Sequence, residues 1–382
     1  MKRILAGVTA AGAALGFGAA MAQHPVDGGI EMIEAISPVA AEVHFFHNIV
    51  LLPVIIGISL LVLALLVWVM VRYSAKANPV PRKFSHNTLV EIIWTGVPIL
   101  ILVYIALFSF DLLFKEDTIP DGKQVVAQAD GSQSAFVFAN DFPDSRKVSR
   151  PEQVQVFLAS GAGEKRLSYR SDYKLSGLGK PEVTVTLNTA PASGERVIIR
   201  GGRSLVGVAP FFGAGEDNRE IALAPTMTLK VIGFQWGWTY TYPDFGDFEF
   251  TASPLEKEQT TPEQYLFETD NHVVVPVGET IRVTTTARDV IHSWAMPNFA
   301  IKIDAVPGRI NETWFKAERE GTYYGQCSEI CGIKHAYMPI TIDVVSRPAF
   351  EAWVDSQRAM AGLEPMFGQS NVKFAQASVE TE

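Results

Sequence analysis

A short segment of the chain concentrates side chains that bind soft metal ions. It contains, in order, Cys327, Cys331, His335 and Met338. The two cysteines are the only ones among 382 residues, and three residues separate them. Thiolate, imidazole and thioether groups are ligands that copper favours. The spacing, with Gly332 directly after the second cysteine, is typical of a loop that curls around a metal ion.

A second histidine is the candidate partner of this loop. His292 lies 35 residues before Cys327 and directly after a turn that ends a predicted strand. A second loop can therefore bring its imidazole to the same end of a β-barrel.

Four interpretations of these residues compete. An exported cysteine pair forms a disulfide by default, and zinc accepts two thiolates with two imidazoles. A blue-copper centre uses one cysteine, two histidines and an axial methionine. Two thiolates, two imidazoles and one thioether also suffice for two copper ions that share both sulfurs, which spreads one electron over two metals. A disulfide has no use for the flanking His335 and Met338, and a blue-copper centre has none for the second thiolate.

The composition excludes several classes of protein. The chain has 32 Lys+Arg against 41 Asp+Glu, a net charge of −9, with 48% hydrophobic and 19% charged residues. It is too apolar to be disordered, and at about 150 residues per domain it has room for two or three units. The acidic balance argues against nucleic acid, whose phosphates select basic surfaces, and favours a basic protein partner. Two cysteines cannot form a disulfide framework.

Residues 1–22 have the layout of a secretory signal peptide. Lys2 and Arg3 precede a short apolar stretch rich in Ala and Gly, and Ala20-Met21-Ala22 matches a cleavage site. A retained membrane anchor is the alternative. Residues 23–44 then form a short segment outside the membrane.

Two further apolar runs, 49–71 and 92–110, carry no charge. Each is long enough to cross a hydrocarbon core of about 30 Å, so we expect a transmembrane hairpin over residues 45–115. The loop between them carries the basic residues Arg72, Lys76, Arg82 and Lys83. The positive-inside rule therefore places this loop in the cytoplasm and the remaining chain in the periplasm. Glu91, at the cytoplasmic lip, is either an interfacial carboxylate or part of a proton path.

Beyond the hairpin the pattern changes from helical to extended. Between residues 225 and 345, short β-branched or alternating runs are bounded by turn residues, which is typical of an antiparallel sandwich or barrel. Residues 116–224 also contain strand-like pieces, at 136–139, 154–159, 183–187 and 197–200. They indicate either an inserted β-rich layer or a partly ordered extension. Residues 346–382 are expected to form a short amphipathic helix and a polar tail.

The hairpin, the loop from Cys327 to Met338 and several motifs resemble subunit II of the bacterial haem–copper cytochrome c oxidases, which carries a binuclear copper centre (CuA). The motifs are Asn87-Thr88 with Glu91-Ile92-Ile93-Trp94-Thr95, Gln235-Trp236 with Trp238, Asp289-Val290-Ile291-His292-Ser293-Trp294, and Pro307-Gly308-Arg309. The resemblance covers residues 40–115 and 225–345 and leaves the insertion and the tail outside it.

The resemblance implies a two-helix transmembrane hairpin followed by an all-β Greek-key barrel of cupredoxin type. The copper ligands that it implies are the side chains of His292, Cys327, Cys331, His335 and Met338 and the main-chain carbonyl of Glu329. The Glu329 carboxylate is then expected to face a magnesium ion shared with the catalytic subunit.

The same resemblance assigns roles outside the copper site. Trp236 resembles the residue at which an electron from cytochrome c is accepted, whereas Trp238 is better explained as a core residue. Asp270 and Asp289 resemble docking carboxylates for a basic cytochrome c. Glu91 takes the place of a carboxylate at the entrance of a proton path.

The implied function is that of an electron-accepting oxidase subunit in the bacterial inner membrane. It passes electrons from cytochrome c through two copper ions to a haem–copper catalytic subunit, which reduces oxygen to water and pumps protons. Haem is expected only in that partner. One alternative is a quinol oxidase subunit, which lacks the copper ligands. The other is an anchored copper chaperone or electron carrier, for which a single span would serve.

Overall fold

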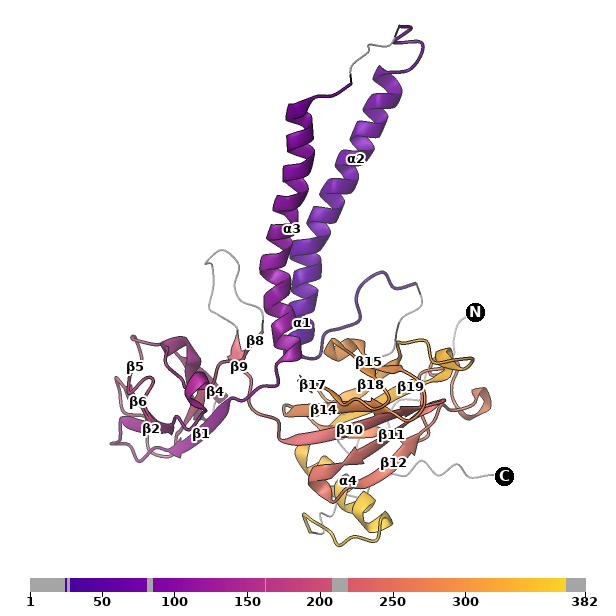
Figure 1. The fold of residues 1–382 in the computed structure, drawn as a ribbon. Coiled ribbons are helices and arrows are strands. Elements are labelled where there is room, and N and C mark those ends of the chain that lie inside the picture. Colours follow the sequence, from indigo (N-terminus) through magenta and orange to yellow (C-terminus); the bar gives the residue numbers. More distant parts are fainter. Residues whose placement is uncertain (1–24, 26–27, 81–84, 162, 208–218, 369–382) are drawn as a thin grey trace, which may run out of the picture.

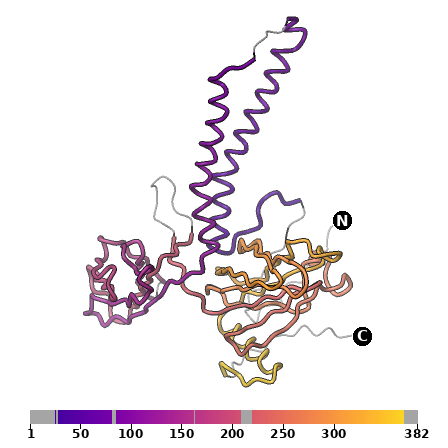
Figure 2. The backbone as a smooth tube through the Cα atoms, viewed as in Figure 1, coloured from indigo at the N-terminus to yellow at the C-terminus, as the bar shows by residue number. Residues whose placement is uncertain are grey.

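The computed structural model describes residues 25, 28–80, 85–161, 163–207 and 219–368. The predicted signal peptide, 1–22, and the end of the predicted tail, from residue 369, lie outside the described residues. Two long helices rise from the junction between two β-rich bodies, a small one formed by the insertion and a large one formed by the C-terminal domain (Figure 1). Figure 2 shows that the chain leaves the hairpin for the small body and returns below the hairpin before it forms the large one.

Two apolar helical segments form the hairpin. The first comprises α1 (Pro38–Phe45), a π-helical turn (Phe46–Leu51) and α2 (Leu52–Arg72), and the second is α3 (Thr88–Asp117). Both are long and apolar enough to cross a membrane, and no side chain of α2 or α3 is buried within this chain. In a bilayer such helices satisfy their backbone groups internally and turn their side chains to lipid or to a partner.

The insertion is a packed β-sandwich with its own core. One sheet has the order β1-β7-β3-β4, with the bounds Lys123–Gln128, Arg196–Gly201, Val154–Ser160 and Gly163–Leu167. The other has the order β2-β6-β5, with the bounds Ala135–Ala139, Glu182–Leu187 and Tyr173–Ser176. Alternate side chains of both sheets meet in one apolar cluster, to which Phe138, Val156 and Val183 contribute fully buried side chains. The insertion is therefore more than a loose extension of the barrel.

The large body consists of two five-stranded sheets packed face to face. One has the order β12-β11-β10-β14-β17, with the bounds Phe248–Ala252, Gly237–Tyr242, Met227–Phe234, Thr280–Ala287 and Asn311–Lys316. The other has the order β13-β19-β18-β15-β16, with the bounds Val273–Pro276, Pro339–Val345, Gly321–Cys327, His292–Met296 and Ile301–Ala305. The predicted hairpin followed by a cupredoxin-type β domain is confirmed. The pairing is not purely antiparallel, because β10 pairs with β14, and β13 with β19, in parallel.

Helix α4 (Arg347–Met360) closes one side of the large body. Its buried residues Phe350, Trp353 and Val354 belong to the barrel core, and the Trp353 ring lies 5.1 Å from the Tyr242 ring. The opposite, hydrophilic face of the helix remains in solvent, as expected of an amphipathic surface helix.

A polar cluster joins the hairpin to both β bodies. Lys115 Nζ, near the end of α3, lies 2.7 Å from a carboxylate oxygen of Glu42 in α1. Glu42 also accepts a hydrogen bond of 2.6 Å from the N–H of Gly207, which follows β8 (Leu205–Val206) of the insertion. The indole N–H of Trp314 in β17 donates to the Lys115 carbonyl at 3.0 Å. These bonds fix three parts of the chain at the base of the hairpin.

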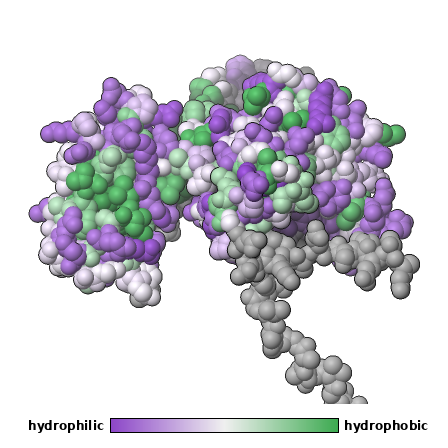
Figure 3. Space-filling view, turned by 90° about the horizontal axis from the view of Figure 1, so that it is seen from below, coloured by the Kyte–Doolittle hydropathy of each residue, from purple (hydrophilic) through white to green (hydrophobic). Residues whose placement is uncertain are grey.

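The short strand β8 pairs with β9 (Glu220–Ile221) beside this cluster. From below, away from the hairpin, the two bodies lie side by side (Figure 3). The large body is mainly hydrophilic on this face, whereas the small one shows an apolar area framed by hydrophilic side chains.

Candidate metal centre

Strand pairing places the two segments with predicted ligands at one end of a sheet. β15 begins at His292 and β18 ends at Cys327, and the two strands pair antiparallel with Trp294 opposite Cys327. The Cys327 N–H donates to the Met338 carbonyl at 2.9 Å. This bond closes the loop between β18 and β19, so that residues eleven positions apart in the sequence become neighbours.

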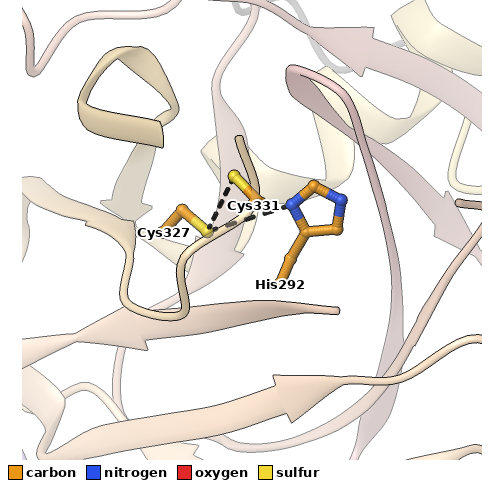
Figure 4. Close-up of side chains that lie close together, drawn as sticks. All are labelled: His292, Cys327 and Cys331. Carbon is orange, nitrogen blue, oxygen red and sulfur yellow. Dashed lines mark hydrogen bonds between the residues drawn. The ribbon is translucent and has the colours of Figure 1, made fainter. Parts of the chain in front are cut away.

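Three predicted ligand atoms form a tight, buried cluster (Figure 4). Cys327 Sγ lies 3.8 Å from Cys331 Sγ and 3.9 Å from His292 Nδ1. The three side chains point toward a common centre from the loop and from the start of β15. All of them are buried, with the His292 side chain fully inaccessible to solvent.

Three further donors surround the two sulfurs. Cys331 Sγ lies 3.6 Å from His335 Nδ1 and 3.9 Å from Met338 Sδ. Cys327 Sγ lies 3.3 Å from the Glu329 carbonyl oxygen. Each sulfur therefore has one imidazole beside it. The Met338 thioether is the additional neighbour of the Cys331 sulfur, and the Glu329 carbonyl is that of the Cys327 sulfur.

The two cysteines are buried free thiols. Their sulfur separation of 3.8 Å far exceeds the bond length of a disulfide, about 2.05 Å. Burial disfavours ionisation of Cys327, but its hydrogen bond with His292 lowers the thiol pKa to about 6. Burial and the charge of Cys327 together raise the pKa of Cys331 to about 12. A bound cation would favour the thiolate form of both sulfurs.

The donor set fits copper better than a hard cation. It combines two thiolates with two imidazoles and a thioether, and no carboxylate joins the cluster among the described residues. Magnesium and calcium prefer oxygen ligands, whereas sulfur and imidazole suit copper. Two facing sulfurs, each with its own imidazole, also supply enough donor atoms for two ions rather than one.

The position of His292 depends on Asp289 and Gly233. The Asp289 Oδ1 lies 2.9 Å from His292 Nε2. Burial opposes the charged form of each residue, but the contact with His292 lowers the Asp289 pKa, and contacts with Cys327 and Asp289 raise the His292 pKa. On the other side of the ring, a Cβ at Gly233 would lie 2.9 Å from His292 Cδ2. Gly233 was not among the predicted site residues, since only the packing of β10 against β15 reveals that it makes room for the His292 ring.

Trp236 lies against the loop that carries the two cysteines. A Cβ at Gly332 would meet the Trp236 ring at 3.3 Å and the Gln235 side chain at 3.0 Å. The Gln235 amide donates to the Cys331 carbonyl at 2.8 Å, and its backbone N–H donates to Asp289 Oδ2 at 2.7 Å. The partly exposed Trp236 is thus held beside the loop, whereas Trp238 is fully buried with its ring 5.9 Å from the His292 ring.

Three predicted site groups lie apart from the cluster. The Glu329 side chain is half-buried on the loop surface. Asp270 is exposed, accepts a 2.7 Å hydrogen bond from the Ser253 N–H, and lines a pocket beside α4. Glu91 lies in the first turn of α3, far from the barrel, where its carboxylate accepts a 3.2 Å hydrogen bond from the Asn87 N–H.

The fold and this cluster define a class of membrane-anchored metalloproteins, in which a two-helix hairpin carries a cupredoxin-type domain. Comparison with known families agrees with this class. Residues 227–345 match the periplasmic domain, and residues 25–112 the transmembrane domain, of cytochrome c oxidase subunit II. The chain belongs to the cytochrome c oxidase subunit II family.

Curated relatives match most of the chain. It is 35% identical over 332 residues to a probable cytochrome c oxidase subunit 2 of Rickettsia felis, covering 86% of this chain and 72% of the relative. It is 32% identical over 352 residues to cytochrome c oxidase subunit 2 of Cereibacter sphaeroides, covering 87% and 82% respectively. The periplasmic domain of subunit II of the Bradyrhizobium japonicum cytochrome oxidase is 49% identical, covering 36% of this chain and 96% of that one, with a TM-score of 0.34.

Proposed function

We propose that this chain accepts electrons from cytochrome c at a binuclear copper centre and delivers them to a haem–copper catalytic subunit. That partner would reduce oxygen to water and pump protons. The observation that carries the proposal is the pairing of donors, because each of the two facing sulfurs has its own imidazole within 4 Å.

His292, Cys327, Cys331, His335 and Met338, with the Glu329 carbonyl, would hold the two copper ions. When bound, the copper pair supplies a one-electron redox couple. The chain's own contribution is a rigid, dry site: the cysteines are buried, Asp289 accepts a hydrogen bond from His292, and the Gln235 amide donates one to the Cys331 carbonyl. A rigid site keeps structural change small when the electron arrives, which favours fast transfer.

The surface next to the loop suits a protein donor of electrons. Trp236 lies beside the loop and is partly exposed, and Ile330 and Ile333 on the loop are 77% and 88% exposed. Asp270 would serve as a docking carboxylate, consistent with the net charge of −9 and with a basic cytochrome c. Asp289 contributes less to docking than to the site, because both of its oxygens accept hydrogen bonds there.

Two carboxylates would connect the chain with the catalytic subunit. The Glu329 side chain, on the same loop as the ligands, would share a magnesium ion with that subunit. Glu91 would lie at the entrance of a proton path at the far end of α3, in addition to capping the first turn of the helix. This arrangement requires the copper domain in the periplasm and the tip of the hairpin at the cytoplasmic face of the bacterial inner membrane.

A copper-free quinol oxidase subunit is disfavoured by the complete donor set. A stand-alone copper chaperone or electron carrier is disfavoured by the second span and by the extensive apolar surface of both helices. A partner in the membrane, together with lipid, would account for that surface.

The test is copper quantitation combined with electron paramagnetic resonance on the full chain loaded with copper. We expect two coppers that share one unpaired electron. Cys331→Ser and His335→Asn should each abolish this signal, because each removes a donor next to the shared sulfurs. One copper with a blue-type spectrum, or a Cys327–Cys331 disulfide without metal, would contradict the proposal.

A further inference from the structure

A pocket at the base of α3 contains cationic side chains that the copper site does not use. The cavity has a volume of about 310 Å³, and its lining includes Phe114 and Lys115 of α3 and Arg203, Leu205 and Arg219 of the insertion. Both arginines lie outside the two segments that match the oxidase family, 25–112 and 227–345. The pocket is therefore a feature of the insertion and of its contact with the hairpin.

The pocket is lined by two guanidinium groups in addition to the Lys115 ammonium. Lys115 lies 2.7 Å from both Glu42 and Asp111, so two carboxylates balance its charge. Arg203 is exposed, and no carboxylate of the described residues forms an ion pair with it. Arg219 lines the same cavity. Guanidinium groups bind phosphate oxygens in a bidentate manner, which makes a phosphate group the matching ligand.

The depth of the pocket matches the headgroup layer of a bilayer. The uncharged run of α3 ends at Phe110, and the pocket residues of this helix, from Asp111 to Thr118, occupy the next two turns. At 1.5 Å per residue they lie about 2–12 Å beyond the hydrocarbon boundary, where the headgroup layer is about 5–8 Å thick. Figure 1 shows β8 and β9 at this level beside the base of the hairpin.

An apolar track leads from the pocket into the membrane. Phe114, in the pocket lining, is 67% exposed, and Leu107 and Leu100, about two and four turns closer to the membrane centre on the same helix face, are 71% and 69% exposed. Leu205 and Trp314 add apolar surface to the pocket wall. A free phosphate ion would leave this surface unused, whereas an acyl chain would cover it.

We propose that this pocket binds the phosphate headgroup of an anionic phospholipid in the leaflet on the side of the copper domain. Arg203 and Arg219 contact the phosphate, and one acyl chain lies along Phe114, Leu107 and Leu100. The lipid would thereby attach the insertion to the membrane surface and stabilise its position beside the hairpin.

The test measures phospholipid retained by the intact oxidase complex. The complex is washed with detergent, supplied with dioleoyl phosphatidylglycerol, and examined by native mass spectrometry. The variant Arg203→Gln/Arg219→Gln is compared with Arg196→Gln/Lys180→Gln, which removes two exposed charges of the insertion away from the pocket. We expect the pocket variant to bind one fewer phosphatidylglycerol, with affinity about tenfold or more lower, while the control binds like the wild type.

Further arms identify the source of the phosphate and guard against misfolding. Dioleoyl phosphatidylcholine and millimolar inorganic phosphate should each fail to displace phosphatidylglycerol from the wild type, and Arg203→Lys/Arg219→Lys should retain most of the binding. A photoactivatable phosphatidylglycerol should label wild-type residues 203–207 or 114–118. Equal binding by the Gln variant, displacement by inorganic phosphate, or a crosslinker at Arg203 that reaches a second subunit in place of lipid would overturn the proposal.

Discussion

The Asp289 carboxylate faces Nε2 of His292 at 2.9 Å, while the opposite ring nitrogen, Nδ1, faces the Cys327 sulfur at 3.9 Å. When Nε2 carries the proton, Asp289 accepts its hydrogen bond and leaves the Nδ1 lone pair for a metal. The second Asp289 oxygen accepts the Gln235 N–H, next to Trp236. One carboxylate therefore connects the predicted ligand His292 with the turn that carries the partly exposed Trp236.

Loss of this carboxylate should weaken copper binding. We expect Asp289→Ala to reduce copper affinity about 10- to 100-fold, the usual effect of removing a group that orients a ligand histidine. Asp289→Asn keeps one oxygen acceptor and should lose less. Copper content after dialysis against a chelator measures the effect, and Glu258→Ala, which removes an exposed carboxylate of the same domain, is the control. If Asp289→Ala lowers only cytochrome c binding, Asp289 is a docking residue and not a positioning one.

A methyl group at position 233 should displace the His292 ring. Gly233→Ala places a Cβ 2.9–3.1 Å from three His292 carbon atoms. Overpacking of this kind costs about 1–3 kcal/mol of stability, and movement of His292 should lower the copper content as well. Gly161→Ala adds a methyl group to an open position of the insertion and should change neither quantity. Full copper occupancy and an unchanged melting temperature in Gly233→Ala would show that the ring has space to shift.

Replacement of Trp236 should affect electron transfer but not the metal. Trp236 contacts the loop at Gly332, yet none of the donor atoms belongs to it. We expect Trp236→Phe to retain the copper spectrum and to slow reduction by cytochrome c in stopped-flow experiments. An unchanged reduction rate in Trp236→Phe would assign the acceptance of electrons to another surface group.

Asp270→Asn should weaken the binding of cytochrome c, with a salt-dependent rise in the dissociation constant, and should leave the rate of electron transfer within the bound complex unchanged.

His272 should make the stability of the barrel depend on pH. Burial opposes its charge, but hydrogen bonds with Asp343 and Glu268, at 2.9 and 2.6 Å, raise its pKa to about 10. A raised pKa in the folded state gives stability that is complete below the unfolded value of about 6.5 and is lost as the pH rises toward 10. His272→Gln should therefore destabilise the domain by about 1–3 kcal/mol at pH 6.

The measurement is the melting temperature of wild type and His272→Gln between pH 6 and pH 10. The difference between them should shrink as the pH rises. His86→Gln, at the exposed tip of the hairpin, should show no such difference at any pH. A difference in melting temperature that stays constant or widens toward pH 10 would show that His272 is neutral in the folded protein.

The sequence alone determined the parts of this protein that depend on local composition. Uncharged runs of 23 and 19 residues, 49–71 and 92–110, can bury their backbone only as helices in a membrane. The amphipathic helix before the tail and several strands of the insertion were also predictable, because helical and alternating periods are local signals. The side chains in the loop from Cys327 to Met338 pointed to copper, because the residue types of a short segment are also local information.

The tertiary structure decided everything that depends on contacts between distant segments. Only the pairing of β15 with β18 places His292 beside Cys327, and only the approach of β10 shows why position 233 must lack a side chain. Asp289 looked like a surface carboxylate, yet the turn before β15 directs it to His292. The pocket at the base of α3 forms between residues about 90 to 200 positions apart in the chain, and no local pattern of hydrophobicity or charge predicts that these residues come together.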